Sequence, residues 1–280
     1  MRISHLFAAL LLVCVCGASE AAPRSPAGEA PPPRFLDPGL QRAAEAAAPA
    51  SIRFVTSDDF PPFNFVDGGG HLIGYHVELA RALCARADIP CTIQVRPFED
   101  LAAAIAGNEA DAVVAGLDPA AAGAEGLLFT RPFFRLPARF VTRTSFTGDA
   151  LPETLAGFAV GVVTGSAEEP YLARHFPQSR VQPFADLAGA LAALEAGTVE
   201  AVFAGSLPLA FWLAGPGAAG CCRFAGPAYA EPRAFRGALR IAVGGDEPAL
   251  RDFLDAGLAR LEADGTLDAL YRRFFPIGLY

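Results

Sequence analysis

The amino-acid sequence alternates short β-forming runs with amphipathic helical stretches, and it does so in two successive series. In the first series, the order strand, helix, strand, helix, strand is expected at residues 52–56, 75–86, 91–95, 99–106 and 111–115. In the second series, the same order is expected at residues 159–163, 167–175, 180–182, 186–195 and 199–204. This alternation is typical of parallel sheets covered by helices. The sequence therefore predicts an α/β fold with two lobes, each a twisted, mostly parallel sheet flanked by helices.

The end of the chain predicts one more strand, at 239–243, and two helices, at 247–263 and 267–274. These elements are too few for a third domain, so we expect them to return to the first lobe. Two hinge crossings, near Ala138 and Pro232, would then join the lobes. The predicted boundaries are residues 51–138 plus 234–280 for the first lobe and 139–233 for the second.

The N-terminus has the features of an export signal. Residues 1–22 carry an early Arg2, an apolar run from Leu6 to Cys16 and small residues suited to cleavage. That run is too short to span a bilayer, so we expect a cleaved signal peptide and a soluble, exported protein in the periplasm. Residues 23–50, which are rich in Ala and Pro, predict a flexible arm.

Composition and charge exclude several functions. All 22 basic residues are Arg, so chemistry that needs a lysine Schiff base or a lysine general base is excluded. The net charge of −8 argues against binding to nucleic acid. The four histidines show neither triad nor metal-ligand spacing, and we expect His71 and His76 to be solvated. We therefore expect a small solute, with no catalytic residue, metal or cofactor.

Four cysteines lie beyond the predicted signal peptide. Cys84 ends a helical pattern and Cys91 opens the next strand, so we expect a disulfide between them, with two separate buried thiols as the alternative. Cys221 and Cys222 are adjacent, with Cα atoms about 3.8 Å apart, which is shorter than the usual disulfide range. We favour structural or incidental thiols there over a redox switch or a soft-metal site.

Five motifs along the chain are specific in combination. The segment 59–65 is similar to the pattern Y-x-P-F, with Phe60 in place of Tyr. The segments 72–80, 129–134, 161–166 and 263–267 are similar, in that order, to L-x-G-[FY]-[DH]-V-[DE]-L-A, F-[ST]-x-P-[YF], G-V-x-x-G-[ST] and A-D-G-T-[LY]. With these motifs, residues 51–275 resemble the periplasmic solute-binding proteins that serve polar amino-acid ABC importers, solute-binding protein family 3. The pair Cys84 and Cys91 also matches a disulfide found in some members.

The resemblance implies a monomer that closes its two lobes on a solute and presents it to an inner-membrane ABC permease. No chemistry is required, because the ligand acts through its higher affinity for the closed state. The ligand-binding positions implied by the matched motifs are Ser57, Phe60, Phe98, Gly116, Asp118, Ser166, Glu168 and Gly205. They follow strands, and ligands of open α/β sheets bind at the carboxyl ends of strands.

Two of the family's amino-acid anchors are absent. Gly123 stands where the family places the Arg that holds the α-carboxylate, on a helix after the third strand, and Gly205 stands where it places the Asp that holds the α-ammonium. Loss of one partner of such a buried pair typically costs about 2–5 kcal/mol, so an ordinary α-amino acid is not expected to bind well. Three arginines that could substitute, Arg131, Arg135 and Arg139, match the stretch that leads to the hinge.

The remaining site residues favour a cationic or neutral solute. Phe60 and Phe98 would provide aromatic walls, and Asp118 and Glu168 would favour positive charge. The alternatives are that the aromatic rings are core residues, that Asp118 caps a helix starting at Pro119, and that Glu168 points to solvent.

Two other functions are considered. A few relatives with this fold are dehydratases, but the matching position in the second lobe is Gly205, which argues against an enzyme. The alternative is a periplasmic accessory protein that keeps the fold but acts on a partner protein, since relaxed ligand selection would lose both anchors.

Overall fold

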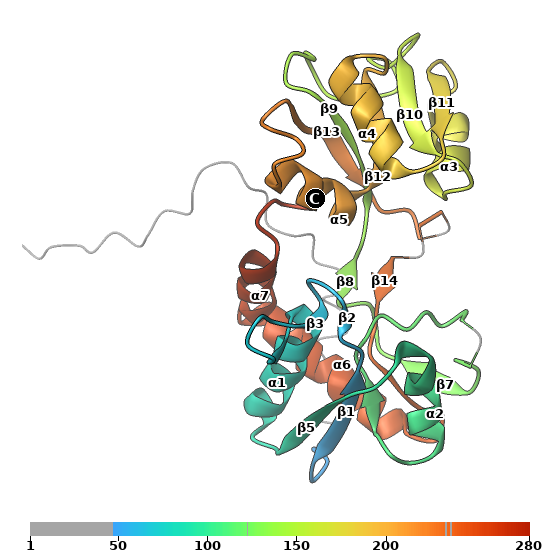
Figure 1. The fold of residues 1–280 in the computed structure, drawn as a ribbon. Helices are drawn as coiled ribbons and strands as arrows, with labels where there is room; N and C mark the ends of the chain where they lie inside the picture. Colours follow the sequence, from blue (N-terminus) through green and yellow to red (C-terminus); the bar gives the residue numbers. More distant parts are fainter. Residues whose placement is uncertain (1–46, 122, 233, 236) are drawn as a thin grey trace, which may run out of the picture.

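The computed structural model describes residues 47–121, 123–232, 234–235 and 237–280. The predicted signal peptide, 1–22, and almost all of the predicted arm, 23–50, lie outside these residues. The described chain forms two lobes stacked on either side of a narrow waist (Figure 1). Each lobe contains a five-stranded mixed sheet flanked by helices, which confirms the predicted α/β two-lobed fold class.

The sheet of the first lobe has the order β5-β1-β6-β15-β7. Its strands are β1 (Ile52–Thr56), β5 (Cys91–Val95), β6 (Ala112–Val113), β7 (Leu127–Phe129) and β15 (Ala242–Gly244). Strand β1 is parallel to β5 and β6, whereas β15 is antiparallel to β6 and β7. Because β1 is covered on both faces, Phe54 packs into one apolar cluster and its neighbour Val55 into another.

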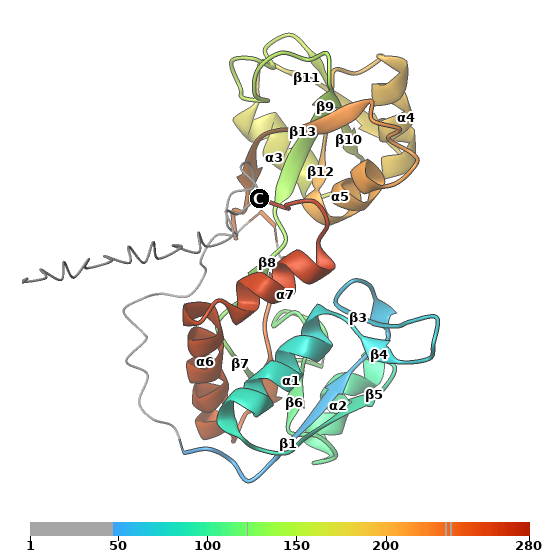
Figure 2. The ribbon, with the colours of Figure 1, turned by 90° about the vertical axis from the view of Figure 1, so that its left-hand side faces the viewer.

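Helices cover both faces of this sheet. On one face lie α1 (Tyr75–Ala87), α6 (Pro248–Ala263) and α7 (Thr266–Phe274), which pack against one another (Figure 2). On the other lie the 3₁₀ turn η2 (Phe98–Asp100) and α2 (Leu101–Ala106), whose Leu101 and Ile105 are buried. Three short strands, β2 (Asp59–Phe60), β3 (Asn64–Val66) and β4 (Leu72–Ile73), form a separate antiparallel sheet.

The sheet of the second lobe has the order β11-β10-β12-β9-β13. Its strands are β9 (Ala138–Arg143), β10 (Ala159–Val163), β11 (Arg180–Phe184), β12 (Ala201–Gly205) and β13 (Cys222–Tyr229). Its helices are α3 (Glu168–His175), α4 (Leu187–Ala196) and α5 (Ser206–Ala214). Strand β10 is parallel to β11 and β12, as expected, and β9 runs antiparallel to both β12 and β13.

A two-stranded antiparallel ribbon forms the waist between the lobes (Figure 1). It pairs β8 (Phe134–Arg135) with β14 (Ala238–Leu239). The single strand expected at 239–243 is therefore divided into β14 and β15, because its first residues belong to the waist. The exact residue at which each lobe begins stays a prediction.

The C-terminal segment, residues 275–280, adds a second connection beside the waist. It leaves α7 in the first lobe and reaches the second lobe (Figures 1 and 2). The Arg139 guanidinium of β9 donates hydrogen bonds to the main-chain oxygens of Gly278 (3.4 Å), Tyr280 (3.1 Å) and Gly226 (3.0 Å). The same guanidinium lies 4.1 Å from the centre of the Phe224 ring. Arg139 of the second lobe thus holds a segment whose buried Leu279 belongs to the apolar cluster of the first lobe's core, a cluster that also includes Ala210 of α5.

Both pairs of cysteines beyond the predicted signal are disulfide-bonded. The Cys84–Cys91 disulfide joins α1 to β5, as predicted. The expectation of separate thiols at Cys221 and Cys222 is wrong, because these neighbours form a vicinal disulfide. The chain enters the pair through a tight turn, in which the Cys221 amide donates to the Ala218 carbonyl (2.7 Å) and Gly220 has φ +74°.

Candidate ligand-binding site

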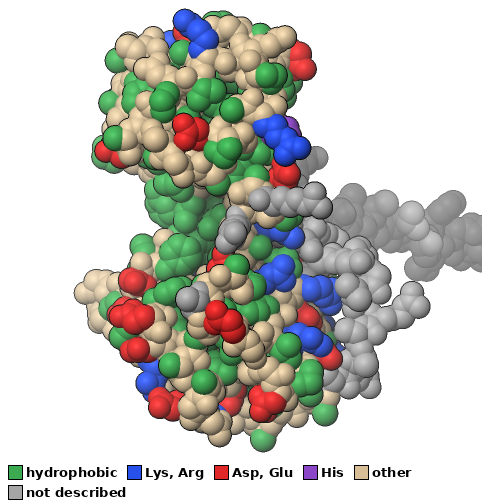
Figure 3. Space-filling view, turned by 90° about the vertical axis from the view of Figure 1, so that its right-hand side faces the viewer, with side chains coloured by type: hydrophobic (Ala, Val, Ile, Leu, Met, Phe, Trp, Pro, Cys, Tyr) green, Lys and Arg blue, Asp and Glu red, His purple; other side chains and the backbone are tan. Residues whose placement is uncertain are grey.

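The carboxyl ends of the parallel strands in both lobes point toward the waist. In the second lobe, Gly205 at the end of β12 pairs with Ala138, the first residue after the waist crossing. In the first lobe, Val113 at the end of β6 pairs with Ala242, which follows the other crossing. Strand exits of this kind are where open α/β sheets bind ligands. The space-filling surface is hollowed between the lobes, and apolar side chains gather at the waist there (Figure 3).

The wall of the first lobe brings together two expected site residues, Phe60 and Gly116. The half-buried Phe60 ring stacks on Phe63, with ring centres 4.8 Å apart. A Cβ atom on Gly116 would lie 3.3 Å from Phe60 Cε1 and 3.4 Å from Leu239 Cδ2 of the waist. Because Gly116 also has φ +78°, glycine suits both the backbone conformation and the close approach of the ring.

Phe98 and Ser57 lie in contrasting environments. Phe98 is 40% exposed, so its ring is not part of the core, and its role as a wall stays a prediction. Ser57 is 1% exposed, and both its carbonyl and hydroxyl oxygens accept hydrogen bonds from Asn64 Nδ2, at 3.0 and 2.9 Å. The Ser57 side chain therefore holds the loop after β1 in place.

The prediction that His76 is solvated is wrong. Its side chain is fully buried in the first turn of α1, between the rings of Phe63 and Phe133. Burial lowers the pKa of His76 to about 3, so its imidazole is neutral. Nδ1 lies 2.7 Å from Asn64 Oδ1, to which it donates, and Asn64 in turn binds Ser57. Helical periodicity placed His76 near a helix start, but the aromatic rings that bury it come from distant segments.

The loop after β6 differs from the expected helix. Residues 117–121 and 123–126 contain turns but no helix, and Gly123 and Gly126 both have φ +84°. Asp118 Oδ1 accepts a hydrogen bond from the Ala120 amide (2.9 Å), so this carboxylate closes a turn and does not cap a helix at Pro119. The described residues of this loop thus contain neither the helix on which the family places its arginine nor the arginine itself.

Arg131 and Arg139, which were considered as substitutes, are held by contacts with other groups of the protein. The Arg131 amide donates to Asp255 Oδ1 (2.8 Å), and its Nε lies 3.9 Å from Asp255 Oδ2. Arg139 binds the C-terminal segment, as described above. Burial raises the pKa of Asp255 and lowers that of Arg139, although the amide and charge of Arg131 partly oppose the shift at Asp255.

The second lobe carries a pocket of about 250 Å³ beside the waist. We call it the waist pocket; its apolar lining includes Leu136, Pro137, Ala167, Leu207, Pro208 and Phe235. Two expected site residues, Glu168 and Gly205, also line it, together with Ser206, which sequence reasoning missed. The third expected residue of this lobe, Ser166, lies two residues before Glu168 and has a buried hydroxyl oxygen.

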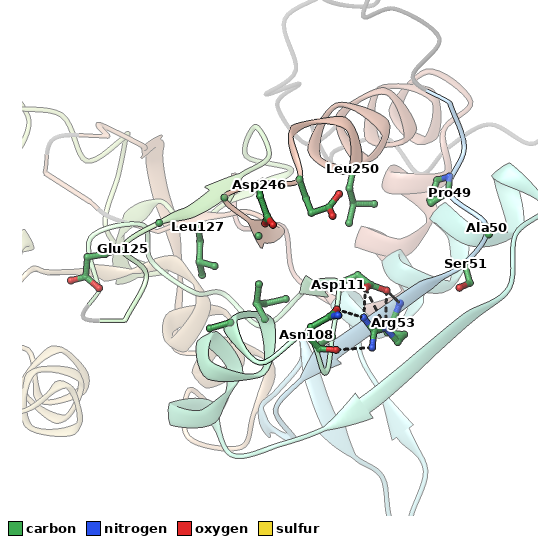
Figure 4. Close-up of a pocket in the computed structure, with 17 residues that line it drawn as sticks. Pro49, Ala50, Ser51, Arg53, Asn108, Asp111, Glu125, Leu127, Asp246 and Leu250 are labelled. Carbon is green, nitrogen blue, oxygen red and sulfur yellow. Dashed lines mark hydrogen bonds and ion pairs between the residues drawn. The ribbon is translucent and has the colours of Figure 1, made fainter.

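A larger hollow, of about 730 Å³, lies in the first lobe at the amino ends of its parallel strands, away from the waist (Figure 4). There Arg53 and Asp111, at the amino ends of β1 and β6, form an ion pair at 2.6 Å, and Arg53 also donates to the Asn108 carbonyl (2.9 Å). Burial raises the pKa of Asp111, but the hydrogen bonds and charge of Arg53 outweigh it and leave that pKa lowered. This hollow is distant from the strand exits, and its central charges bind each other.

Comparison with known proteins agrees with this architecture. Strand exits from two sheets that face each other across a waist define a two-lobed solute receptor. Residues 52–277 match the family model for bacterial extracellular solute-binding proteins, family 3, and the chain belongs to that family. Members of the family bind solutes and are not enzymes.

Several relatives are similar over most of their length. ABC transporter arginine-binding protein 1 of Escherichia coli K12 is 26% identical over 231 residues, which are 82% of this chain and 93% of that protein. The histidine-binding periplasmic protein of the same strain is 24% identical over 240 residues, 85% and 92% of the two chains. The L-cystine solute receptor of Neisseria gonorrhoeae has a similar fold, with TM-score 0.67, 18% identity and coverage of 80% and 92%. Among the described residues, no helix has the length and apolar character needed to cross a membrane.

Proposed function

We propose that this protein is a periplasmic receptor that binds a small solute between its lobes and delivers it to an inner-membrane ABC permease. The observation that carries the proposal is the match of residues 52–277 to solute-binding protein family 3, in a structure whose two sheets direct their strand exits toward one waist. The periplasmic relatives and the predicted signal peptide support the location.

We further propose that the solute is not a standard α-amino acid. A zwitterion needs a cation for its carboxylate and an anion for its ammonium, yet glycines stand at both anchor positions, Gly123 and Gly205. Arg131 and Arg139 bind other groups. Leaving a buried charge of the solute unpaired costs about 2–5 kcal/mol, which weakens binding by a factor of roughly 30 or more.

The aromatic wall at Phe60 and the carboxylate of Glu168 in the waist pocket favour a cationic or neutral solute. Isothermal titration of the purified protein against amino acids, organic cations and neutral solutes tests this. We expect a cation or a neutral solute to bind more tightly than any α-amino acid. Tight binding of glutamate or aspartate, without response to any cation, would contradict the proposed specificity.

Native mass spectrometry of the protein as purified is a second test of the receptor function, because a closed receptor retains its solute. A retained small molecule supports the proposal. If no member of a broad solute panel shifts the melting temperature, and a pulldown instead recovers a periplasmic protein, the chain acts on a partner and the receptor proposal fails.

A further inference from the structure

The waist pocket combines an apolar lining with two polar groups that face no described partner. Ser206, the first residue of α5, is fully buried, and its hydroxyl oxygen has no hydrogen-bond partner among the described residues. Its amide is already used, since it donates to the Pro137 carbonyl (2.8 Å). A buried hydroxyl without a partner is uncommon in proteins and indicates a missing partner.

Glu168 supplies a carboxylate to the same pocket. Its Oε1 lies 3.9 Å from the position that a Cβ atom on Gly205 would occupy, so it lies above the floor formed by the start of α5. No ion pair joins Glu168 to another residue in the described part of the chain. The next residue, Glu169, differs, because its carboxylate closes a turn by accepting a hydrogen bond from the Gly165 amide (2.8 Å).

The chemistry of this pair selects the ligand. A carboxylate and a hydroxyl oxygen can both accept hydrogen bonds from one ammonium group, which has three N–H donors and a positive charge. The start of α5 alone would favour an anion, but the Glu168 carboxylate already lies near that end of the helix and would repel a second one. Among the described lining residues, Glu168 is the only ionisable side chain, so none of them supplies a positive charge for a solute carboxylate.

The pocket is suited to one end of a solute. Its volume of about 250 Å³ is slightly below the roughly 300 Å³ at which small-molecule pockets begin, so it holds the charged end and a short apolar stem. The rest of the solute would extend toward the first lobe. There Phe60 lies beside Leu239 of β14. Strand β14 pairs with β8, and Leu136, the residue after β8, lines the pocket. The two-stranded ribbon therefore connects the Phe60 wall with the pocket.

We propose that the waist pocket is a subsite for a primary ammonium group, held by Glu168 and Ser206, and that the solute is an organic amine with an apolar body. This inference rests on the proposed receptor function and sharpens it. Glu168 determines specificity by charge, and Ser206 orients the ammonium through its hydroxyl oxygen.

The test uses the full mature chain and matched probes. Phenethylamine, putrescine and agmatine supply primary ammonium groups on different bodies. Phenylalanine adds a carboxylate to phenethylamine, and 2-phenylethanol removes its charge. We expect isothermal titration to show that at least one amine binds, and that removing the charge weakens the binding of phenethylamine at least about tenfold if phenethylamine is that amine.

Variants separate recognition from folding. Glu168→Gln keeps the size of the side chain and removes the charge, so it should weaken amine binding at least about tenfold. Ser206→Ala should weaken it less, about threefold to tenfold, because a neutral hydrogen bond is lost. Glu169→Gln is the matched control on the same helical turn and should leave the affinity unchanged. Melting curves of all three variants report whether each one folds.

Each outcome decides between the two proposals. If an amine binds and Glu168→Gln abolishes binding while Glu169→Gln does not, the amine subsite is supported. If none of the three amines binds but native mass spectrometry finds a retained neutral or anionic solute, the subsite is overturned and the receptor function stands. If Glu168→Gln lowers the melting temperature without changing amine affinity, Glu168 is only a structural cap for α5 and the subsite is overturned. If no solute binds or is retained, both proposals fail.

Discussion

Removing the Arg139 guanidinium should loosen the C-terminal segment from the second lobe. In Arg139→Ala, the main-chain oxygens of Tyr280 and Gly226 lose charged hydrogen bonds of 3.1 and 3.0 Å, and a weaker one of 3.4 Å to Gly278 is also lost. The contact with the Phe224 ring disappears as well.

The size of the effect follows from these contacts. A hydrogen bond to a charged group contributes about 1.5–3 kcal/mol, and a cation–π contact contributes about 0.5–2 kcal/mol, depending on burial. Arg139 is only partly buried and these contributions are not additive, so we expect a loss of about 3 kcal/mol in the free energy of unfolding. For a chain of this length, that loss lowers the melting temperature by roughly 6–12 °C.

Two measurements check this prediction. Urea unfolding gives the free energy, and hydrogen–deuterium exchange of residues 275–280 reports on the segment itself, whose Leu279 amide donates to the Tyr271 hydroxyl (2.6 Å). Arg139→Ala should increase exchange there. Arg223→Ala is the control, because Arg223 donates to Phe146, Gly148 and Phe224 oxygens within the second lobe. A loss below about 1 kcal/mol, or equal exchange of the segment in both variants, would refute the reasoning.

Three further predictions concern the first lobe. Replacing Cys84 and Cys91 by Ser should cost about 2.5 kcal/mol of unfolding free energy by the loop-entropy estimate, and reductant should then have a smaller effect on the melting temperature of the variant than on that of the parent. Burial lowers the pKa of His76 to about 3 in the folded state, against about 6.5 in the unfolded chain, so its contribution to stability is complete above pH 6.5 and is lost as the pH falls toward 3. His76→Gln should therefore flatten the dependence of the unfolding free energy on pH over that range. An unchanged slope would count against the burial argument. Gly116→Ala should cost about 1–2 kcal/mol in urea unfolding, because alanine is strained at φ +78° and its methyl group would press on Phe60; a neutral effect would show that this loop adapts freely.

The parallel strands and their helices could be predicted because each carries its own local pattern. The expected strand at 91–95 and the structure's β5 coincide, and α6 and α7 begin within one residue of the expected starts. The antiparallel strands β9 and β13 were not anticipated, because their pairing joins segments that lie on either side of the whole second series. Helix α5 was also missed. Its sequence is apolar on all sides and therefore has no helical periodicity, and it contains Pro208.

The motifs name candidate site residues, but they do not show which of these residues lie together or what surrounds them. In the structure, Phe60 lies close to Gly116 in the first lobe, and Glu168 and Gly205 line one pocket of the second. The burial of His76 depends on the rings of Phe63 and Phe133, which come from two other segments of the chain, so the local pattern around His76 does not reveal it. Ser206 carried no sequence signal beyond its place directly after Gly205, because an unsatisfied hydroxyl is visible only in three dimensions.

The chain order of the strands has a consequence for the order in which the two sheets can assemble. The second sheet is made from one uninterrupted stretch, from β9 to β13. In the first sheet, one edge of β6 pairs with β15, which follows the whole second sheet in the chain, so this edge stays unpaired until β15 has been synthesised. A chain that emerges from its N-terminus can therefore complete the later sheet while the earlier one still exposes an open edge. Unpaired edges invite association with other chains, so this interval is when the folding protein is most vulnerable to aggregation.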